Sequence, residues 1–180
     1  MEYFDIVDEN GIPTGKIKER TLAHKTGVRH RTAHVWIVRR REGKIQILLQ
    51  KRCKDKDSFP GCYDISSAGH IPAGMDYIPS ALRELEEELG LSVSAEELID
   101  CGLHRKFIAL MFHGTPFVDN QVSRVYLLWK DIEIEDLKIQ YEEIESMMWM
   151  DFEECKQSVS NNSFPNCIDV EELELLEARF

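Results

Sequence analysis

The stretch GHIPAGMDYIPSALRELEEELGL, from Gly69 to Leu91, contains the most informative pattern in the chain. Its second half predicts an amphipathic helix from about Asp76 to Leu89, with Gly90 as the residue that ends it. At about 100° per residue, five apolar side chains fall on one stripe of this helix: Ile78, Ala81, Leu82, Leu85 and Leu89. We expect this stripe to pack against a hydrophobic core.

Three acidic side chains lie on a different face of the same helix. Glu84, Glu87 and Glu88 are spaced i, i+3 and i+4, and like charges at that spacing repel by roughly 0.2–0.5 kcal/mol per pair. They also lie near the C-terminal end of the helix, where the macrodipole disfavours anions. A stretch that violates two local rules together is typical of a functional site. A bound divalent cation is the simplest compensation.

The composition limits the classes of partner. The chain has 180 residues, a hydrophobic fraction of 43% and a net charge of −11, which indicates a globular domain and argues against binding to nucleic acid polymers or anionic membranes. Bound metal ions could still attract a small phosphorylated substrate. There is no run of about 18 apolar residues and no signal-peptide pattern at Met1–Gly11. Five scattered cysteines without CxxC spacing indicate reduced thiols, so we expect a cytoplasmic location.

Alternation and turn residues predict a mixed α/β chain. Glu19 to Arg31 is polar and is expected to be an irregular connection, and Gly114–Pro116 is expected to break the chain. We expect strands at Tyr3–Asp8, Thr14–Lys18, His34–Arg40, Lys44–Arg52, Tyr63–Ser66, Leu103–Met111 and Gln121–Lys130. Tyr141–Met150 should be an acidic loop entering a strand, and helices are expected within Asp151–Ser158 and over Val170–Phe180.

The opening stretch resembles the Nudix box, G-x5-E-x7-R-E-U-x-E-E-x-G-U, where U is an apolar residue. Eight of its nine specified positions match: Gly69, Arg83, Glu84, Leu85, Glu87, Glu88, Gly90 and Leu91. A solvated acidic helix face would explain one or two glutamates, but not the spaced glycines and the arginine as well. The resemblance implies an α/β/α sandwich around a mixed sheet. We expect one Nudix domain over residues 1–180, with residues 1–31 as an N-terminal hairpin extension.

The resemblance also implies the chemistry. Nudix proteins bind Mg²⁺ or Mn²⁺ and hydrolyse a diphosphate bond in nucleoside diphosphates joined to another group, and hard oxygen ligands suit these ions. It implies that Glu84, Glu87 and Glu88 are metal ligands, that the carbonyl of Gly69 contributes, and that Arg83 orients the carboxylates. The expected partner is a small diphosphate substrate; a homodimer is compatible with the sequence.

Met75 is the one departure from the box, because the family places a glutamate there. That glutamate mainly pairs with the box arginine, here Arg83, and a thioether cannot accept a comparable charge-assisted hydrogen bond. Support for the metal ligands should therefore be weaker. The same substitution leaves open a protein that senses nucleotides without turning them over.

A narrower resemblance, from Tyr3 to Leu91, is to the isopentenyl-diphosphate-isomerase-like branch of the Nudix proteins. It is carried by FDIVDENGIPTGK, HRTAHVWIV, ILLQKR and FPGCYDISSAGH. True isomerases have a catalytic cysteine immediately before the Gly-His of the last segment, and this chain has Ala68, while Cys62 lies six positions too early. Because double-bond isomerisation needs a proton donor and acceptor, a hydrolase is the preferred interpretation and an isomerase the alternative.

The histidines can be interpreted in two ways. In the isomerases, histidines near this region bind a separate metal ion; His30 and His70 match those positions, and His24 lies close to the remaining one. Taken alone, each is more often a packed or polar histidine than a metal ligand, and for His70 a contact with the substrate or with the metal ligands is preferred.

The other candidates lie on the fourth predicted strand and on the late acidic loop. Lys51 and Arg52 end the strand and resemble residues that face substrate phosphate in the family, although a solvated strand end is equally consistent. The late segment resembles a loop in which many members place a further glutamate facing the metal. The candidates for this general base or additional ligand are Glu142, Glu143 and Glu145, although a solvated acidic loop is equally consistent for any one of them and the sequence does not assign the base.

Overall fold

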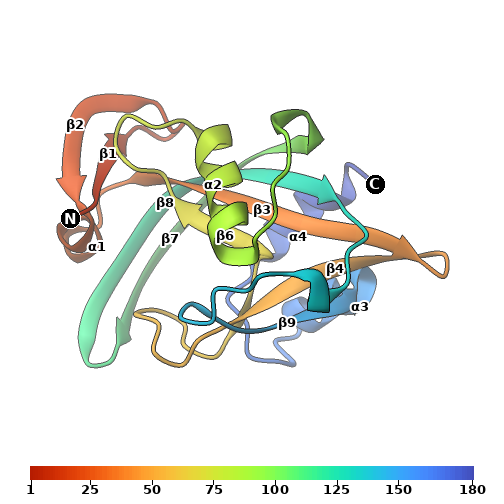
Figure 1. Cartoon of the computed structure of the whole chain (residues 1–180). Helices are drawn as coiled ribbons and strands as arrows, with labels where there is room; N and C mark the ends of the chain where they lie inside the picture. The colour runs from red at the N-terminus through yellow and green to blue at the C-terminus, as the bar shows by residue number, and fades with distance from the viewer.

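The computed structural model describes residues 1–180, and most of the chain is organised around a mixed sheet of seven strands (Figure 1). Its path runs β5-β4-β3-β8-β7, while β6 pairs with β3 and β9 pairs with β4. The strands are β3 (His30–Arg41), β4 (Lys44–Arg52), β5 (Tyr63–Asp64), β6 (Ser67–His70), β7 (Leu98–Phe112), β8 (Thr115–Trp129) and β9 (Ile144–Asp151).

Strand β3 is central because its side chains are buried on both faces of the sheet. It runs parallel to β8, from His30 opposite Gln121 to Val38 opposite Trp129, and antiparallel to β4 and β6. Its near-continuous apolar run, HVWIV, suits a strand covered on both sides. The strands expected at 34–40 and 44–52 are confirmed.

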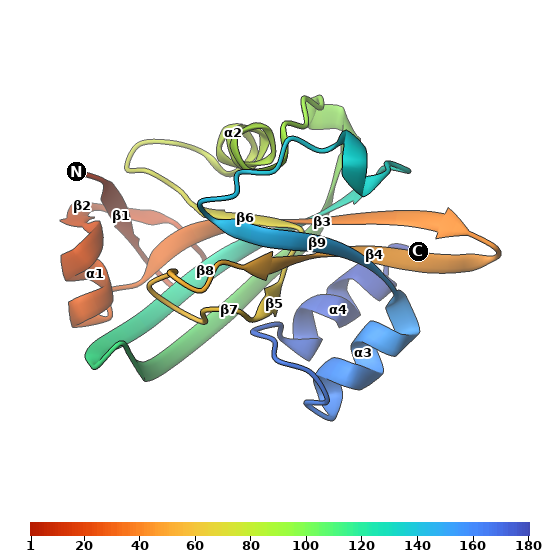
Figure 2. The same ribbon diagram turned by 60° about the horizontal axis from the view of Figure 1, so that its bottom comes forward.

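Helices cover both faces of the sheet, as Figure 2 shows: α2 (Tyr77–Leu89) lies on one face, and α3 (Phe152–Ser160) and α4 (Val170–Glu177) lie on the other. The alternation of β3 divides the core accordingly. Val35 and Ile37 pack in the cluster on the α2 side, whereas Trp36 and Val38 pack in the cluster with α3 and α4. The expected α/β/α sandwich is therefore confirmed.

The N-terminal hairpin is formed by β1 (Tyr3–Val7) and β2 (Pro13–Glu19), as expected. The expectation of an irregular connection after it was wrong, because α1 covers Arg20–Thr26. The Glu19 carboxylate accepts a hydrogen bond from the amide of Leu22, which satisfies one of the free amides at the helix start. Gly27 ends the helix with a φ of 66°.

Strands β7 and β8 form a hairpin of 15 residues in each strand, longer than the sequence predicts. Its tip extends past α1, at the end of the sheet that also carries the N-terminal hairpin (Figure 1). The turn is at His113–Gly114, and Pro116 belongs to β8, so the expected break at Gly114–Pro116 is only partly right. Pro116 is tolerated because β8 pairs with β3 only from Gln121 onward.

The remaining elements agree broadly with expectation. The acidic segment leads into β9, and α3 and α4 occupy the two predicted C-terminal helical regions. Short 3-10 turns occur at Ala95–Glu97 and Ile134–Asp136. The strand expected at Tyr63–Ser66 ends at Asp64, and β6 at Ser67–His70 was not predicted. All five cysteines are free thiols. None of the helices is long and apolar enough to cross a membrane.

Candidate functional site: a carboxylate helix and a histidine cluster

Helix α2 presents the three glutamates of the opening stretch beside strand β6. It follows Asp76 and ends at Gly90, whose φ of 66° places it in the left-handed region. Ala81, Leu85 and Leu89 are buried in the core, so most of the predicted stripe is confirmed. Leu82 is only partly buried and Ile78 is exposed, so the stripe is narrower than expected.

Glu88 is the most buried of the three carboxylates, with an exposed fraction of 5%. The Ser67 hydroxyl donates to its Oε2 at 2.7 Å, and the Ala68 amide donates to the same oxygen at 3.3 Å. Burial raises the pKa of Glu88 to about 8, against the opposing effect of the Ser67 hydrogen bond. A bound divalent cation would favour the carboxylate form, so this position suits a metal ligand.

Glu84 lies directly against Gly69 of β6. A Cβ at position 69 would collide with the Glu84 carboxyl group, so only glycine leaves room for this carboxylate. Burial raises the pKa of Glu84 to about 6, although Arg83 acts in the opposite direction. Arg83 donates to Glu84 at 2.6 Å and lies 3.7 Å from Glu87.

Arg83 therefore pairs with Glu84 instead of with a residue at position 75. The side chain of Met75 is 42% exposed, and its carbonyl accepts a hydrogen bond from Arg31. Glu87 is the most exposed of the three glutamates. Its ion pair with the partly exposed Arg83 is a weak contact that a cation could replace.

These side chains line a cavity of about 290 Å³, which we call the outer cavity. Gly69, Glu84, Glu87 and Glu88 line it together with Arg83 of the same helix, and three basic residues from elsewhere in the chain contribute to the lining: Arg20, Arg52 and Lys56. Mixed carboxylates and cations in one cavity match a divalent metal ion bound together with phosphate oxygens.

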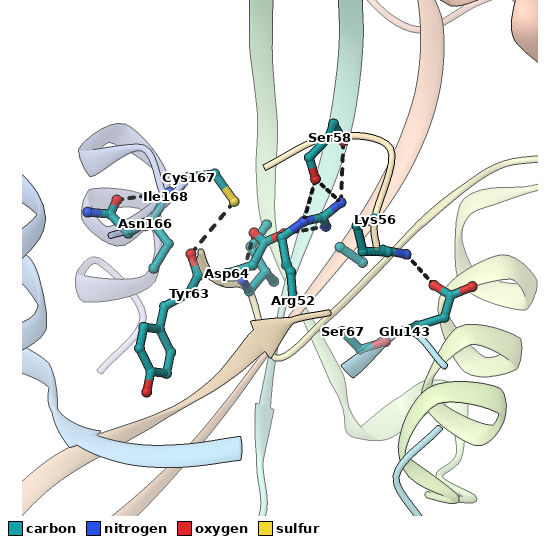
Figure 3. Close-up of polar contacts among 12 residues, drawn as sticks. Arg52, Lys56, Ser58, Tyr63, Asp64, Ser67, Glu143, Asn166, Cys167 and Ile168 are labelled. Carbon is teal, nitrogen blue, oxygen red and sulfur yellow. Dashed lines mark hydrogen bonds and ion pairs between the residues drawn. The ribbon is translucent and has the colours of Figure 1, made fainter. Parts of the chain in front are cut away.

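The late acidic loop contributes one of its three candidates to this cavity. Glu143 lines the outer cavity and pairs with Lys56, at 2.5 Å (Figure 3). Glu142 is exposed at the preceding position. Glu145 pairs with Lys51. Neither Glu142 nor Glu145 lines the outer cavity.

The two basic residues at the end of β4 have different surroundings, because successive strand residues face opposite ways. Arg52 lines the outer cavity and donates to Asp64 at 2.9 Å and to the Ser58 carbonyl (Figure 3). Lys51 faces away, in its pair with Glu145. His70 lines the outer cavity as well.

A second cluster of ligand-type side chains adjoins the outer cavity. The ligand atoms of His24, His30, His70 and Asp119 lie within 4.8 Å of one another, although the residues come from four elements. The Nε2 atoms of the three histidines and Oδ1 of Asp119 are buried without hydrogen-bond partners. Because an unpaired buried polar atom is costly, four such atoms aimed at one point fit a bound metal ion.

Burial favours the neutral imidazole at His24 and at His70. Burial, with the charge of His30 adding to it, lowers the pKa of His24 to about 4. Burial also lowers the pKa of His70 well below its usual value. The amide of Gln121 donates to Oδ2 of Asp119 at 2.6 Å, while Oδ1 lies 3.3 Å from Nε2 of His30 without a hydrogen bond. Neutral imidazole nitrogens and a carboxylate are the donors that Zn²⁺, Mn²⁺ and similar ions take.

Comparison with known families gives a direct match. Residues 28–166 match the NUDIX domain. The chain is 38% identical over 164 residues to Nudix hydrolase 3 of Arabidopsis thaliana, and the match covers 88% of this chain but only 20% of that relative. It is 34% identical to an uncharacterised Nudix hydrolase of Clostridium acetobutylicum, over 89% of this chain and 75% of the relative.

Solved structures share the fold at lower identity. The Deinococcus radiodurans protein DR0079 superposes with a TM-score of 0.70 at 18% identity, covering 96% of this chain and 98% of that chain. The NUDIX domain of Shewanella oneidensis NrtR, solved with ADP ribose, has a TM-score of 0.59 at 14% identity, with coverages of 83% and 86%.

Proposed function

The chain belongs to the Nudix family of phosphoanhydride hydrolases, and on that premise we propose that it hydrolyses a diphosphate bond in a small nucleoside-diphosphate-type substrate with Mg²⁺ or Mn²⁺. One observation carries the proposal: the carboxylate of Glu88 is buried in the outer cavity with only Ser67 and Ala68 as hydrogen-bond donors. A buried carboxyl group without a cationic partner either keeps its proton or binds a cation, and a divalent ion in the outer cavity would hold Glu88 in its charged form.

Glu84, Glu87, Glu88 and the Gly69 carbonyl would hold the metal ion. When bound, the ion neutralises phosphate charge and makes a coordinated water more acidic. Gly69 contributes in a second way, because its missing side chain leaves room for the Glu84 carboxylate.

The remaining groups bind the substrate or move the proton. Arg52 and Lys56 line the cavity and would contact phosphate oxygens, as would His70. Glu143 is the candidate base: released from Lys56 when that lysine turns to a phosphate, it would accept a proton from the attacking water. The new bond joins the water oxygen to phosphorus, and the bond from that phosphorus to the bridging oxygen breaks. Arg83 acts by positioning Glu84.

The histidine cluster supports a second metal ion beside the first. His24, His30, His70 and Asp119 would hold it, and His70 also lines the outer cavity. An ion there would place additional positive charge near the substrate phosphates. This is the separate histidine site expected as an alternative from the isomerase resemblance.

Two other functions remain as alternatives. An isomerase would need a proton donor and acceptor beside the allyl group, and Ala68, which lines the outer cavity, supplies neither. A nucleotide sensor without turnover is favoured only by Met75, whose usual glutamate is missing.

The test is a screen of the purified chain with Mg²⁺ or Mn²⁺ against nucleoside di- and triphosphates, ADP-ribose, nucleotide sugars, dinucleotides and prenyl diphosphates. We expect release of phosphate or nucleotide from at least one diphosphate, and none after chelation of the metal. Conversion of isopentenyl to dimethylallyl diphosphate would instead support the isomerase. Tight nucleotide binding without turnover across the panel would support the sensor.

A further inference from the structure

The loop between β6 and α2, residues 71–76, connects Gly69 to the helix that carries the three glutamates. In the family this loop carries the box glutamate, which pairs with the box arginine. Here Met75 holds that position, and its 42% exposed side chain offers Arg83 no charged partner. In this chain the loop is held by other contacts, and they come from the N-terminal part of the molecule.

The first set of contacts is made by the backbone of the N-terminal hairpin. Strand β1 forms an antiparallel bridge to the loop at Phe4 and Pro72, and the Ala73 amide donates to the Tyr3 carbonyl at 2.7 Å. The loop accordingly lies against the hairpin in Figure 1. Phe4 is fully buried, so water does not compete for this contact.

The second set of contacts is made by two charged side chains. Oδ2 of Asp5, on β1, accepts a hydrogen bond from the Gly74 amide at 2.8 Å and another from Arg31, on β3, at 2.9 Å. The same terminal nitrogen of Arg31 donates to the Met75 carbonyl at 2.8 Å. One ion pair therefore holds two consecutive residues of the loop, one through its amide and the other through its carbonyl.

This ion pair is shielded from water. The side chains of Arg31 and Asp5 are only 6% and 12% exposed, and hydrogen bonds to charged groups are roughly twice as strong as those between neutral groups. The Arg31 guanidinium also lies 5.3 Å from the ring centroid of Tyr77, the first residue of α2. Arg31 thus contacts both the loop and the start of the helix that the loop leads into.

We propose that Asp5 and Arg31 are positioning residues for the metal site and take over the role of the missing box glutamate. This inference rests on the proposed function. The ion pair fixes the loop, and the loop fixes the Gly69 carbonyl relative to the Glu84 carboxylate, which lies directly against it. The N-terminal hairpin is therefore a working part of the metal site.

The experiment measures how Mg²⁺ changes the Tm of the full chain without substrate, since an ion that binds only the folded state raises Tm. Asp5→Ala removes the shared acceptor, and Arg31→Met removes the donor but keeps an aliphatic side chain. Loss of a residue that orients metal ligands weakens metal binding about 10- to 100-fold, so we expect each variant to lower the apparent Mg²⁺ affinity about tenfold or more. The Tm without Mg²⁺ reports any loss of fold stability separately.

Rescue by Met75→Glu distinguishes positioning from a general loss of structure. In Asp5→Ala it should restore the Mg²⁺ affinity at least about tenfold, because the new carboxylate ties the loop to Arg83. In the wild-type background the loop is already held, so the same substitution should have a much smaller effect, which measures the added charge alone.

The matched control is Asp8→Ala, in the same hairpin. Asp8 also accepts two backbone hydrogen bonds, from Asn10 and Ile12, but they stay within the hairpin. This variant should lower Tm and leave the Mg²⁺ affinity unchanged.

The outcomes separate this inference from the proposed function. If wild type binds Mg²⁺ and Asp5→Ala binds it equally well, or if Met75→Glu has the same effect in both backgrounds, the positioning role is overturned while hydrolysis stands. If the variants show the expected loss and rescue of Mg²⁺ binding but no diphosphate is hydrolysed, the positioning role stands and the proposed hydrolysis fails. A wild type whose Tm does not respond to Mg²⁺ would overturn both.

Discussion

Replacing Glu172 with glutamine should destabilise the protein strongly, although the residue lies on α4, far along the chain from the box. Its carboxylate accepts from Trp36 at 2.9 Å, contacts His34 at 2.7 Å and lies 3.1 Å from His104. Breaking a buried ion pair costs about 3–5 kcal/mol. Glutamine can still accept from Trp36, so we expect a loss of about 3 kcal/mol, equivalent to about 6–12 °C in Tm at this chain length.

The pH dependence of this loss has a definite sign. Burial opposes the charged form of Glu172, but the adjacent His34 and His104 outweigh it and hold the pKa of this carboxyl far below its ordinary 4.5. Burial also opposes protonation of His34, yet Glu172 raises the His34 pKa above 6.5. The stabilisation should therefore be complete between pH 4.5 and 6.5, decline as pH falls further, and decline again as pH rises through the raised His34 pKa.

The assay is urea denaturation of wild type and Glu172→Gln across this pH range. The control is Glu174→Gln, an exposed position on the same helix, which should stay within about 0.5 kcal/mol of wild type. A Glu172→Gln difference below about 1 kcal/mol, or one that does not vary with pH, would refute the reasoning.

Three further predictions concern the site. Met75→Glu should raise Mg²⁺-dependent hydrolysis or leave it unchanged, because it offers Arg83 a further carboxylate partner beside Glu84 and Glu87, and a large loss in steady-state rate would contradict this. Gly69→Ala should displace Glu84 and lower kcat by about 100-fold with an unchanged circular dichroism spectrum; normal turnover would show that the close contact is unimportant. His24→Ala should weaken Mn²⁺ or Zn²⁺ binding in calorimetry at least about tenfold, and identical isotherms would rule out the histidine cluster as a metal site.

Much of the fold could be predicted because local patterns determine it. The alternation in β4 and the apolar run of β3 gave the right strands, and the stripe of α2 with Gly90 gave the right helix. The first helix, Arg20–Thr26, was missed because it begins after Glu19 and not after one of the usual Ser, Thr, Asp or Asn caps. The length of the β7–β8 hairpin depends on pairing between distant residues, which local pattern does not report.

The site was only partly predictable for a similar reason. Glu84, Glu87 and Glu88 share one helix, so their spacing carried the information. The histidine cluster gathers residues from α1, β3, β6 and β8, and Asp119 has no local signal that connects it to His24 or His70. A charged residue at a strand end can point to either face of the sheet. Only the observed strand pairing shows that Arg52 points into the outer cavity while Lys51 points away from it.

The most direct test of a metal site built on Glu88 is the Mg²⁺ dependence of diphosphate hydrolysis in Glu88→Gln beside Glu86→Gln. Glu86 is exposed on the same helix and serves as the matched control. Loss of a ligand should lower kcat by at least roughly 100-fold in Glu88→Gln with the fold intact, while Glu86→Gln stays near wild type. Full activity of Glu88→Gln, or of the wild type after complete chelation of metal, would contradict the account.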